Sequence, residues 1–209
     1  LYHDYRALSV MVLLILPLIY ENYRRHEYNL VILGPDLPYL PSEGRIVVDQ
    51  KDLAGLSEVE VSKYRNQTVG FVFQAHHLLP SCTVLENVML PGLAGFNEKA
   101  SGQLKDRANQ LLEEVGLAHR TAHFPGQISG GERQRVAVAR SLINQPSVLL
   151  ADEPTGALDR KNSEHLIDLL KKLNEEKGLT LVMVTHSGVS ASQMKQAYRL
   201  DEGRLRHER

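Results

Sequence analysis

Short apolar runs alternate with amphipathic helical segments along most of this chain. Residues 29–33 (NLVIL), 147–151 (SVLLA) and 179–184 (LTLVMV) are almost wholly apolar, and residues 45–49 and 68–74 are rich in β-forming side chains. Residues 101–115, 132–143 and 161–176 place apolar side chains at helical spacing. A strand that is apolar on both faces has to be covered on both, and strands that alternate with helices form parallel sheets. The pattern therefore predicts an α/β fold with a parallel-sheet core.

Length and composition limit the architecture further. The 209 residues fit one domain, 1–209, with a core of about 1–74 and 145–209 and an inserted helical sub-domain at about 75–144. The chain has 24 Lys and Arg residues and 25 Asp and Glu residues, so it has no excess of positive charge. This balance argues against a nucleic-acid partner held by bulk charge. The single cysteine, Cys82, excludes an internal disulfide and a Cys-rich zinc site.

Residues 7–19 (ALSVMVLLILPLI) form an apolar segment that is too short for a bilayer span, which needs roughly 20 residues. The residues before it carry no net positive charge, and no A-x-A site follows, so a signal peptide is disfavoured. We interpret it as a buried strand or core helix and expect a cytoplasmic protein.

The sequence ISGGE, residues 128–132, leads directly into the helix ERQRVAVARSL. Ser129 is a good N-cap, and Gly130 and Gly131 leave backbone N–H groups uncovered at the positive end of the helix dipole, before Glu132. Such a helix start suits phosphate oxygens. The alternative is an ordinary capped helix after a glycine turn.

Two adjacent carboxylates, Asp152 and Glu153, follow the apolar run SVLLA. Charges that leave a buried strand are costly unless a ligand uses them, and the carboxyl end of a strand is where α/β sheets bind ligands. Neighbouring residues of a strand point in different directions, so Asp152 can hold Mg²⁺ while Glu153 polarises an attacking water. The alternative is a capping role for the pair.

Taken together, residues 127–159 (QISGGERQRVAVARSLINQPSVLLADEPTGALD) resemble the ATPase subunit of an ABC transporter. ISGGE matches the signature motif, LLADE the Walker B motif, GALD the D-loop, VTH the switch histidine and VFQ the Q-loop. Residues 75–91 (AHHLLPSCTVLENVMLP) are most similar to the lipoprotein-releasing and macrolide-exporting branch. The resemblance implies a P-loop NTPase-like core with an antiparallel β portion.

The resemblance also implies residue roles. Ser129, Gly130, Gly131 and Glu132 would meet the γ-phosphate of ATP held by the opposite subunit of a homo- or heterodimer. His186 would bond that phosphate and position the water, and Gln74 would reach Mg²⁺ and the water. Asp159 would organise the dimer seam.

One family motif is missing. A P-loop, GxxxxGK[ST], wraps the phosphates, yet no Gly-Lys dipeptide occurs in the sequence. Gly34, after the strand NLVIL, stands where the first glycine of the motif belongs, but about a dozen residues are absent before residues 41–49 (PSEGRIVVD), which match the next strand of the family. Any of Tyr20, Tyr23 and Tyr28 can stack a base. Three explanations compete: an omitted segment, a misassigned N-terminal part, or a subunit that truly lacks the motif.

We therefore expect an ATP-hydrolysing ABC subunit, with ATP and Mg²⁺ as cofactors, that powers transport through a transmembrane permease from the inner face of the membrane. Residues 76–91 are the expected permease contact, although their apolar side chains can equally be core. The alternative function is a degenerate, non-hydrolysing subunit. An ABC ATPase of DNA repair or translation is disfavoured, since this chain holds neither a coiled-coil insertion nor tandem cassettes.

Overall fold

The computed structural model describes residues 28–33, 47–48, 51–52, 56–94, 101–201 and 204–208. Six strands form the main sheet in the spatial order β4-β5-β6-β1-β7-β8. Their bounds are Val69–Val72 (β4), Val148–Asp152 (β5), Thr180–Thr185 (β6), Tyr28–Leu33 (β1), Gln196–Asp201 (β7) and Arg204–His207 (β8). A separate pair joins β2 (Val47–Val48) and β3 (Lys51–Asp52).

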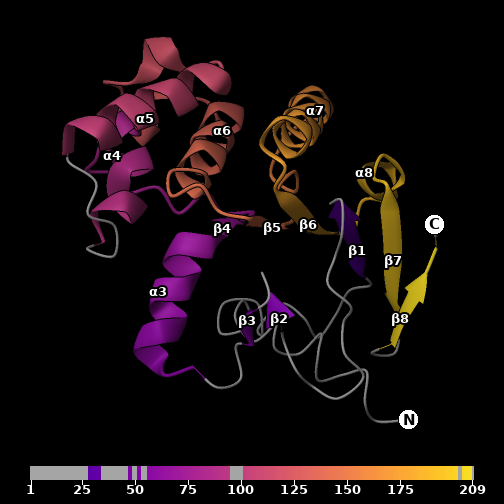
Figure 1. Ribbon diagram of the computed structural model, residues 1–209. Helices are drawn as coiled ribbons and strands as arrows, with labels where there is room; N and C mark the ends of the chain where they lie inside the picture. The colour runs from indigo at the N-terminus through magenta and orange to yellow at the C-terminus, as the bar shows by residue number, and fades with distance from the viewer. Residues whose placement is uncertain are drawn as a thin grey trace.

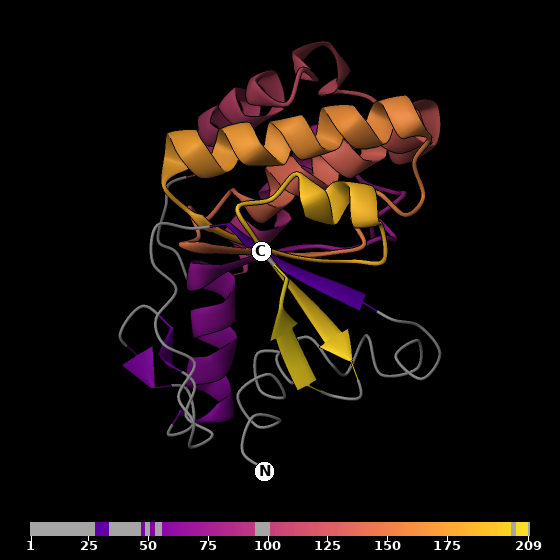
Figure 2. The same ribbon diagram turned by 90° about the vertical axis from the view of Figure 1, so that its right-hand side faces the viewer.

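The predicted α/β class is confirmed. Strands β4, β5 and β6 are parallel, and β1, β7 and β8 add the antiparallel portion. The helices are α3 (Glu58–Thr68), α4 (Val84–Met89), α5 (Ser101–Glu114), α6 (Gly130–Ser141), α7 (Arg160–Lys177) and α8 (Gly188–Ser192), with 3₁₀ turns at Leu90–Leu93, Ala118–Arg120 and Pro125–Gln127. Helices α6, α7 and α8 lie over one face of the sheet and α3 lies on the other (Figures 1 and 2).

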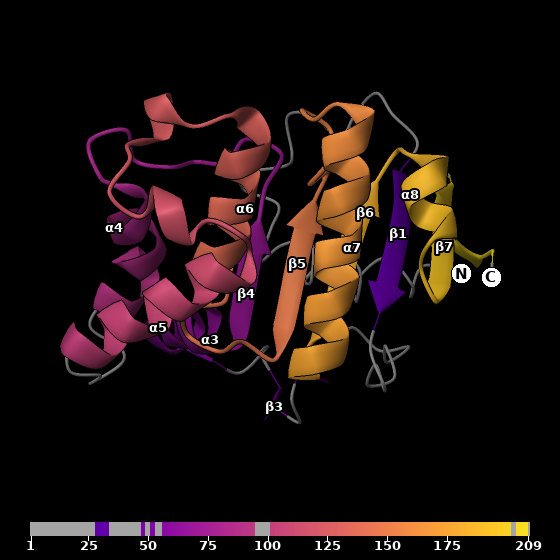
Figure 3. The same cartoon turned by 90° about the horizontal axis from the view of Figure 1, so that it is seen from above.

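Strand β1 departs from the expected direction. It lies beside β6, but the pairing is antiparallel, with Asn29 opposite Thr185 and Leu33 opposite Leu181. The arrows of β5 and β1 accordingly point in opposite directions in Figure 3. An apolar run such as NLVIL is compatible with either strand direction, so the sequence pattern alone does not fix the direction of β1.

Helices α5, α6 and α7 agree with the predicted amphipathic segments to within about two residues, which is the ordinary uncertainty of helix ends. Helix α3 was not expected, because it buries only Tyr64 and presents no apolar stripe. Its start nevertheless carries a recognisable signal. Ser57 and Glu60 form a reciprocal capping box, the S/T-x-x-E pattern.

One buried cluster of apolar side chains joins the helices between β4 and β5 to the sheet. It runs from Val72, Val84 and Val88 through α5 and α6 to Leu170 on α7 and Met183 on β6. The sub-domain boundary at 75–144 stays a prediction. Of the residues expected to contact a permease, Val84 and Val88 are core, whereas Leu79 is exposed.

No helix within the described ranges is long and apolar enough to span a bilayer. The apolar segment 7–19 lies outside those ranges, as do Gly34, Tyr20 and Tyr23.

Leu170→Ala tests the packing of α7 on the sheet. Leu170 is completely buried, so its truncation should lower the free energy of unfolding by about 3 kcal/mol. The neighbouring Leu169 is only partly buried, and Leu169→Ala should cost about 1 kcal/mol. Urea unfolding followed by circular dichroism measures both. Equal losses would contradict this orientation of α7.

Candidate functional site

The parallel strands bring three predicted segments to one edge of the sheet. Val72 pairs with Ala151, and Asp152 pairs with Val184, so β4, β5 and β6 end at the same level. Gln74, Glu153 and His186 follow these strand ends directly. This edge is the end of the sheet at which parallel α/β folds bind ligands.

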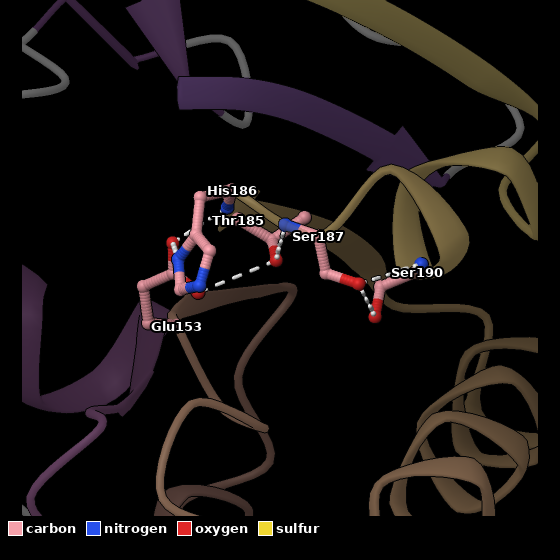
Figure 4. Close-up of polar contacts among 5 residues, drawn as sticks. All are labelled: Glu153, Thr185, His186, Ser187 and Ser190. Atoms are coloured by element: carbon pink, nitrogen blue, oxygen red, sulfur yellow. Dashed lines mark hydrogen bonds and ion pairs between the residues drawn. The ribbon is translucent and has the colours of Figure 1, made fainter. Parts of the chain in front are cut away.

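Glu153 is the most tightly held side chain of this edge. Its residue is only 6% exposed, and its backbone N–H donates to the Val184 carbonyl at 2.9 Å. One carboxylate oxygen, Oε1, accepts the His186 backbone N–H at 2.6 Å, and Thr185 Oγ1 donates to Oε2 at 3.3 Å. Figure 4 shows the contacts of Glu153 with Thr185 and His186. They compensate the burial of a carboxylate that would otherwise be unfavourable.

The His186 ring completes this arrangement. Its Nδ1 lies 2.6 Å from Glu153 Oε1, while 63% of the side chain stays exposed. With the proton on Nδ1, the ring donates to the carboxylate and keeps Nε2 for a ligand. Glu153 thus orients a histidine whose second nitrogen remains available.

The Glu153 backbone has a φ of +42°, in the left-handed region that non-glycine residues adopt rarely. Such strain is found where the surrounding structure fixes a functional side chain, and here the hydrogen bonds to β6 fix it.

A cleft of about 410 Å³ opens at Glu153 and His186, between α7 and α8. Thr155, Ser187, Ser190, Arg160 and Gln193 contribute polar groups to its walls, and Ile167, Leu158 and Val189 contribute apolar ones. The buried glutamate therefore faces a space that a ligand or an attacking water can enter.

Asp152 lies half-buried beside this pair. Burial, followed by the negative charge of Glu153, raises the pKa of Asp152 to about 6. A cation bound at this carboxylate would relieve both effects. The described residues include no group of three or more metal-ligating side chains, but Mg²⁺ is often held by one or two carboxylates together with substrate phosphates. Asp152 fits that pattern.

Gln74 reaches the same edge from the loop after β4. A Cβ placed on Gly156 would lie 2.8 Å from Gln74 Nε2, so the Gln74 side chain rests against the turn that follows Glu153. The structure thereby brings together Gln74 and the Glu153 turn.

The start of α6 has the predicted capping geometry. Ser129 Oγ accepts the Glu132 backbone N–H at 3.2 Å, and the Glu132 carboxylate accepts the Ser129 N–H at 2.8 Å. Ser129 is exposed to solvent at this helix start. The hydrogen bond from Ser129, with Arg120 3.0 Å away, lowers the pKa of Glu132 to about 2. Glu132 therefore holds the helix start, and its carboxylate points to Ser129 and Arg120.

The start of α6 also touches the start of α7. A Cβ on Gly131 would lie 2.8 Å from Asn162 Oδ1, whereas one on Gly130 would meet nothing closer than 3.8 Å. Asn162 in turn donates to both carboxylate oxygens of Asp159, the N-cap of α7. Asp159 is exposed, and its bonds to Asn162 lower its pKa. Asn162 therefore links the ISGGE segment at the start of α6 to the GALD segment before α7.

Several side chains of the site were not expected from the sequence. Thr185 donates to Glu153, and its hydroxyl also accepts the Ser187 N–H at 3.0 Å. The sequence feature that could have identified Thr185 as a site residue is its position directly before His186, at the end of an apolar strand. Gln134 and Arg140 hold the residues around Gln74 and carried no signal beyond their place on α6.

The comparisons with known proteins agree with this geometry. Residues 36–156 match the protein family described as ABC transporter. This chain belongs to the ABC transporter family. The matched range begins after Gly34, so it gives no evidence for a P-loop glycine at that position.

Two relatives of this ABC protein carry the same name. Two lipoprotein-releasing system ATP-binding proteins LolD, from Rhodopirellula baltica and Saccharophagus degradans, are each 47% identical over 165 residues. Those matches cover 79% of this chain and 71% and 72% of the relatives.

Solved structures show the same fold. The dimeric ATP-binding cassette MJ0796 bound to ADP and Pi is 42% identical with a TM-score of 0.71, over 81% of this chain and 74% of its own. A second dimeric structure of MJ0796, a bacterial ABC transporter cassette, is 44% identical with a TM-score of 0.65, over 75% and 68% of the two chains.

Gly131→Ala tests the close approach of α6 and α7. The added methyl group would overlap Asn162, so the variant should lose about 1–2 kcal/mol of unfolding free energy. Gly130→Ala is the matched control, because its methyl group has space and alanine favours a helix. Thermal unfolding of both variants measures the difference, and two equally stable variants would rule out the contact.

Asp152→Asn tests the burial of this carboxylate through pH. Because the folded pKa of about 6 exceeds the ordinary value of 3.8 for an aspartate, the wild type loses stability as pH rises through this interval, and the full penalty remains above it. The variant should be about 1–2 kcal/mol more stable than the wild type at pH 7.5, after allowance for partial exposure, and equal to it near pH 4.

Urea unfolding at the two pH values measures this effect. Asp168→Asn, an exposed change on α7, is the control. A gain for Asp152→Asn that is the same at both pH values would show that the carboxylate charge is not its source.

Proposed function

We propose that this chain is the ATP-binding and ATP-hydrolysing subunit of an ABC transporter that powers lipoprotein release through a membrane permease. The observation that carries the proposal is the buried Glu153, held by Thr185 and His186 at the cleft. The LolD relatives support the lipoprotein branch.

In this mechanism Glu153 is the general base. Its carboxylate faces the cleft and takes a proton from a water aligned with the γ-phosphate, and its bonds to β6 keep it in place. His186 Nε2 donates to a γ-phosphate oxygen when both ring nitrogens carry a proton, with Nδ1 donating to Glu153 and so orienting the ring.

Asp152 and Gln74 are the groups of this chain that would hold Mg²⁺. The ion, when bound with ATP, neutralises charge that develops on the phosphates. The raised pKa of Asp152 and the position of Gln74 against the Glu153 turn support these assignments.

A second subunit supplies the opposite wall of the nucleotide site. The exposed Ser129 and the open N–H groups of the first turn of α6 form an anion site that faces outward. In the proposed dimer this helix end meets the γ-phosphate bound at the Glu153 edge of its partner, with Gly130, Gly131 and Asp159 at the seam. The dimeric MJ0796 structures support this arrangement.

The proposed location is the inner face of the membrane, where the subunit binds a permease peripherally. Residues 76–91 are the proposed contact, and the exposed Leu79 is its candidate anchor.

A second candidate is a degenerate subunit that lends its α6 end to a competent partner and does not hydrolyse ATP. The absence of a Gly-Lys dipeptide from the sequence motivates it, and the comparisons give it no support. Titration of the purified chain with Mg-ATP, followed by a turnover assay, separates the two functions, since micromolar binding together with hydrolysis would dismiss the degenerate subunit.

Glu153→Gln should lower the rate of ATP hydrolysis by at least about a hundredfold, because the amide cannot accept the proton of the water. The same variant should still dimerise when ATP is added, as measured by light scattering. Glu175→Gln, an exposed change on α7, is the control. Wild-type turnover of Glu153→Gln would exclude Glu153 as the base.

A further inference from the structure

The loop that carries Gln74 is held mainly from α6. We infer that Gln134 and Arg140 are positioning residues that tie this loop, residues 73–77, to the helix that begins with ISGGE, so that a contact of Ser129 with a partner's nucleotide is transmitted to Gln74 of the same chain. The inference rests on the proposed function and extends it to communication between the two sites of a dimer.

Gln134 holds the first part of the loop. It is completely buried, its Nε2 donates to the Phe73 carbonyl at 3.0 Å, and its Oε1 lies 2.5 Å from His76 Nδ1. One buried amide therefore binds the residues on both sides of Gln74 and Ala75. An unpaired buried amide is costly, so Gln134 and the loop are expected to move together.

Arg140 holds the second part. Its two terminal nitrogens donate to the carbonyls of His76 at 2.7 Å and His77 at 2.6 Å. His77 has a φ of +47°, a backbone conformation that needs such support. The planar guanidinium reaches two neighbouring carbonyls at once, which a lysine cannot do.

Helix α6 connects this anchorage to the nucleotide contact. Ser129 is the N-cap of this helix, and Gly131 in its first turn packs against Asn162. Gln134 and Arg140 lie further along the same continuous helix. A displacement of the helix start therefore shifts the carbonyls of residues 73, 76 and 77. Gln74 would shift with them against Gly156, next to Glu153.

A double-mutant cycle on ATP hydrolysis tests the inference. Gln134→Leu should lower kcat about tenfold and leave KM for ATP within about twofold, because the loop loses its position while the ATP contacts remain. In the Gln74→Ala background, Gln134→Leu should have no further effect, because Gln74 is the residue through which it acts. Arg140→Lys should also lower kcat and should also have no further effect in the Gln74→Ala background. This second variant keeps the test valid if Gln134→Leu fails to fold.

Asn144→Ala is the matched control. Asn144 follows α6 and donates to the Asn66 and Pro91 carbonyls at 2.9 and 3.2 Å. Its effect on kcat should add to that of Gln74→Ala. If Gln134→Leu and Arg140→Lys also add to Gln74→Ala, their role is only structural and the inference is overturned.

Hydrogen–deuterium exchange of the full chain without nucleotide gives a readout that does not depend on ATP hydrolysis. Ser129→Ala should raise exchange in residues 74–78 of the otherwise wild-type chain and should not change it further in the Gln134→Leu background. Equal changes in both backgrounds would overturn the inference. A chain that passes this test but fails to hydrolyse ATP would refute the proposed function alone.

Discussion

The carboxylate of Glu153 joins the ends of two parallel strands, and the rest of the site depends on this interaction. Glu153 follows β5, and its carboxylate is contacted by Thr185 and His186, which end and follow β6. Because β5 and β6 are in parallel register, the two segments leave the sheet side by side. The same bonds compensate a buried charge, orient the His186 ring and hold the strained Glu153 backbone.

The two halves of the proposed nucleotide site lie on different kinds of element. The acidic half is built on strand ends, where position is fixed by the sheet, and includes Asp152 and Glu153. The anion-binding half is a helix start whose capping groups, Ser129 and Glu132, are engaged with each other. Contacts of α6 with Asn162 and with the loop of Gln74 connect the two halves within one chain.

Much of this could be predicted from the sequence because the relevant signals are local. The amphipathic helices, the apolar strands and the acidic pair after β5 follow from spacing and burial alone. Three S/T-x-x-E patterns, at Ser57, Thr83 and Ser129, each begin a helix with a capping box. Only the last of these was recognised as a helix start from the sequence, although the pattern would also have revealed α3 and α4.

Other features could not be predicted because they depend on distant segments. The direction of β1 is one of them, because an apolar run is compatible with either direction and β1 pairs with strands more than 140 residues later in the chain. The anchorage of the Gln74 loop joins residues about sixty positions apart in the chain, so no local pattern reports it. The raised pKa of Asp152 likewise needs the packed structure.

The central claim is that each nucleotide site combines Glu153 of one chain with Ser129 of another, and mixed dimers test it most directly. Glu153→Gln and Ser129→Arg chains are each assayed alone and then after mixing, with heterodimer formation verified by native mass spectrometry. Both parents should be inactive. A mixed dimer has one site with both defects and one with neither, so an equal mixture should recover about a quarter of the wild-type ATPase rate. If heterodimers form and no activity returns, the two residues do not serve one site across the dimer, and the account is wrong.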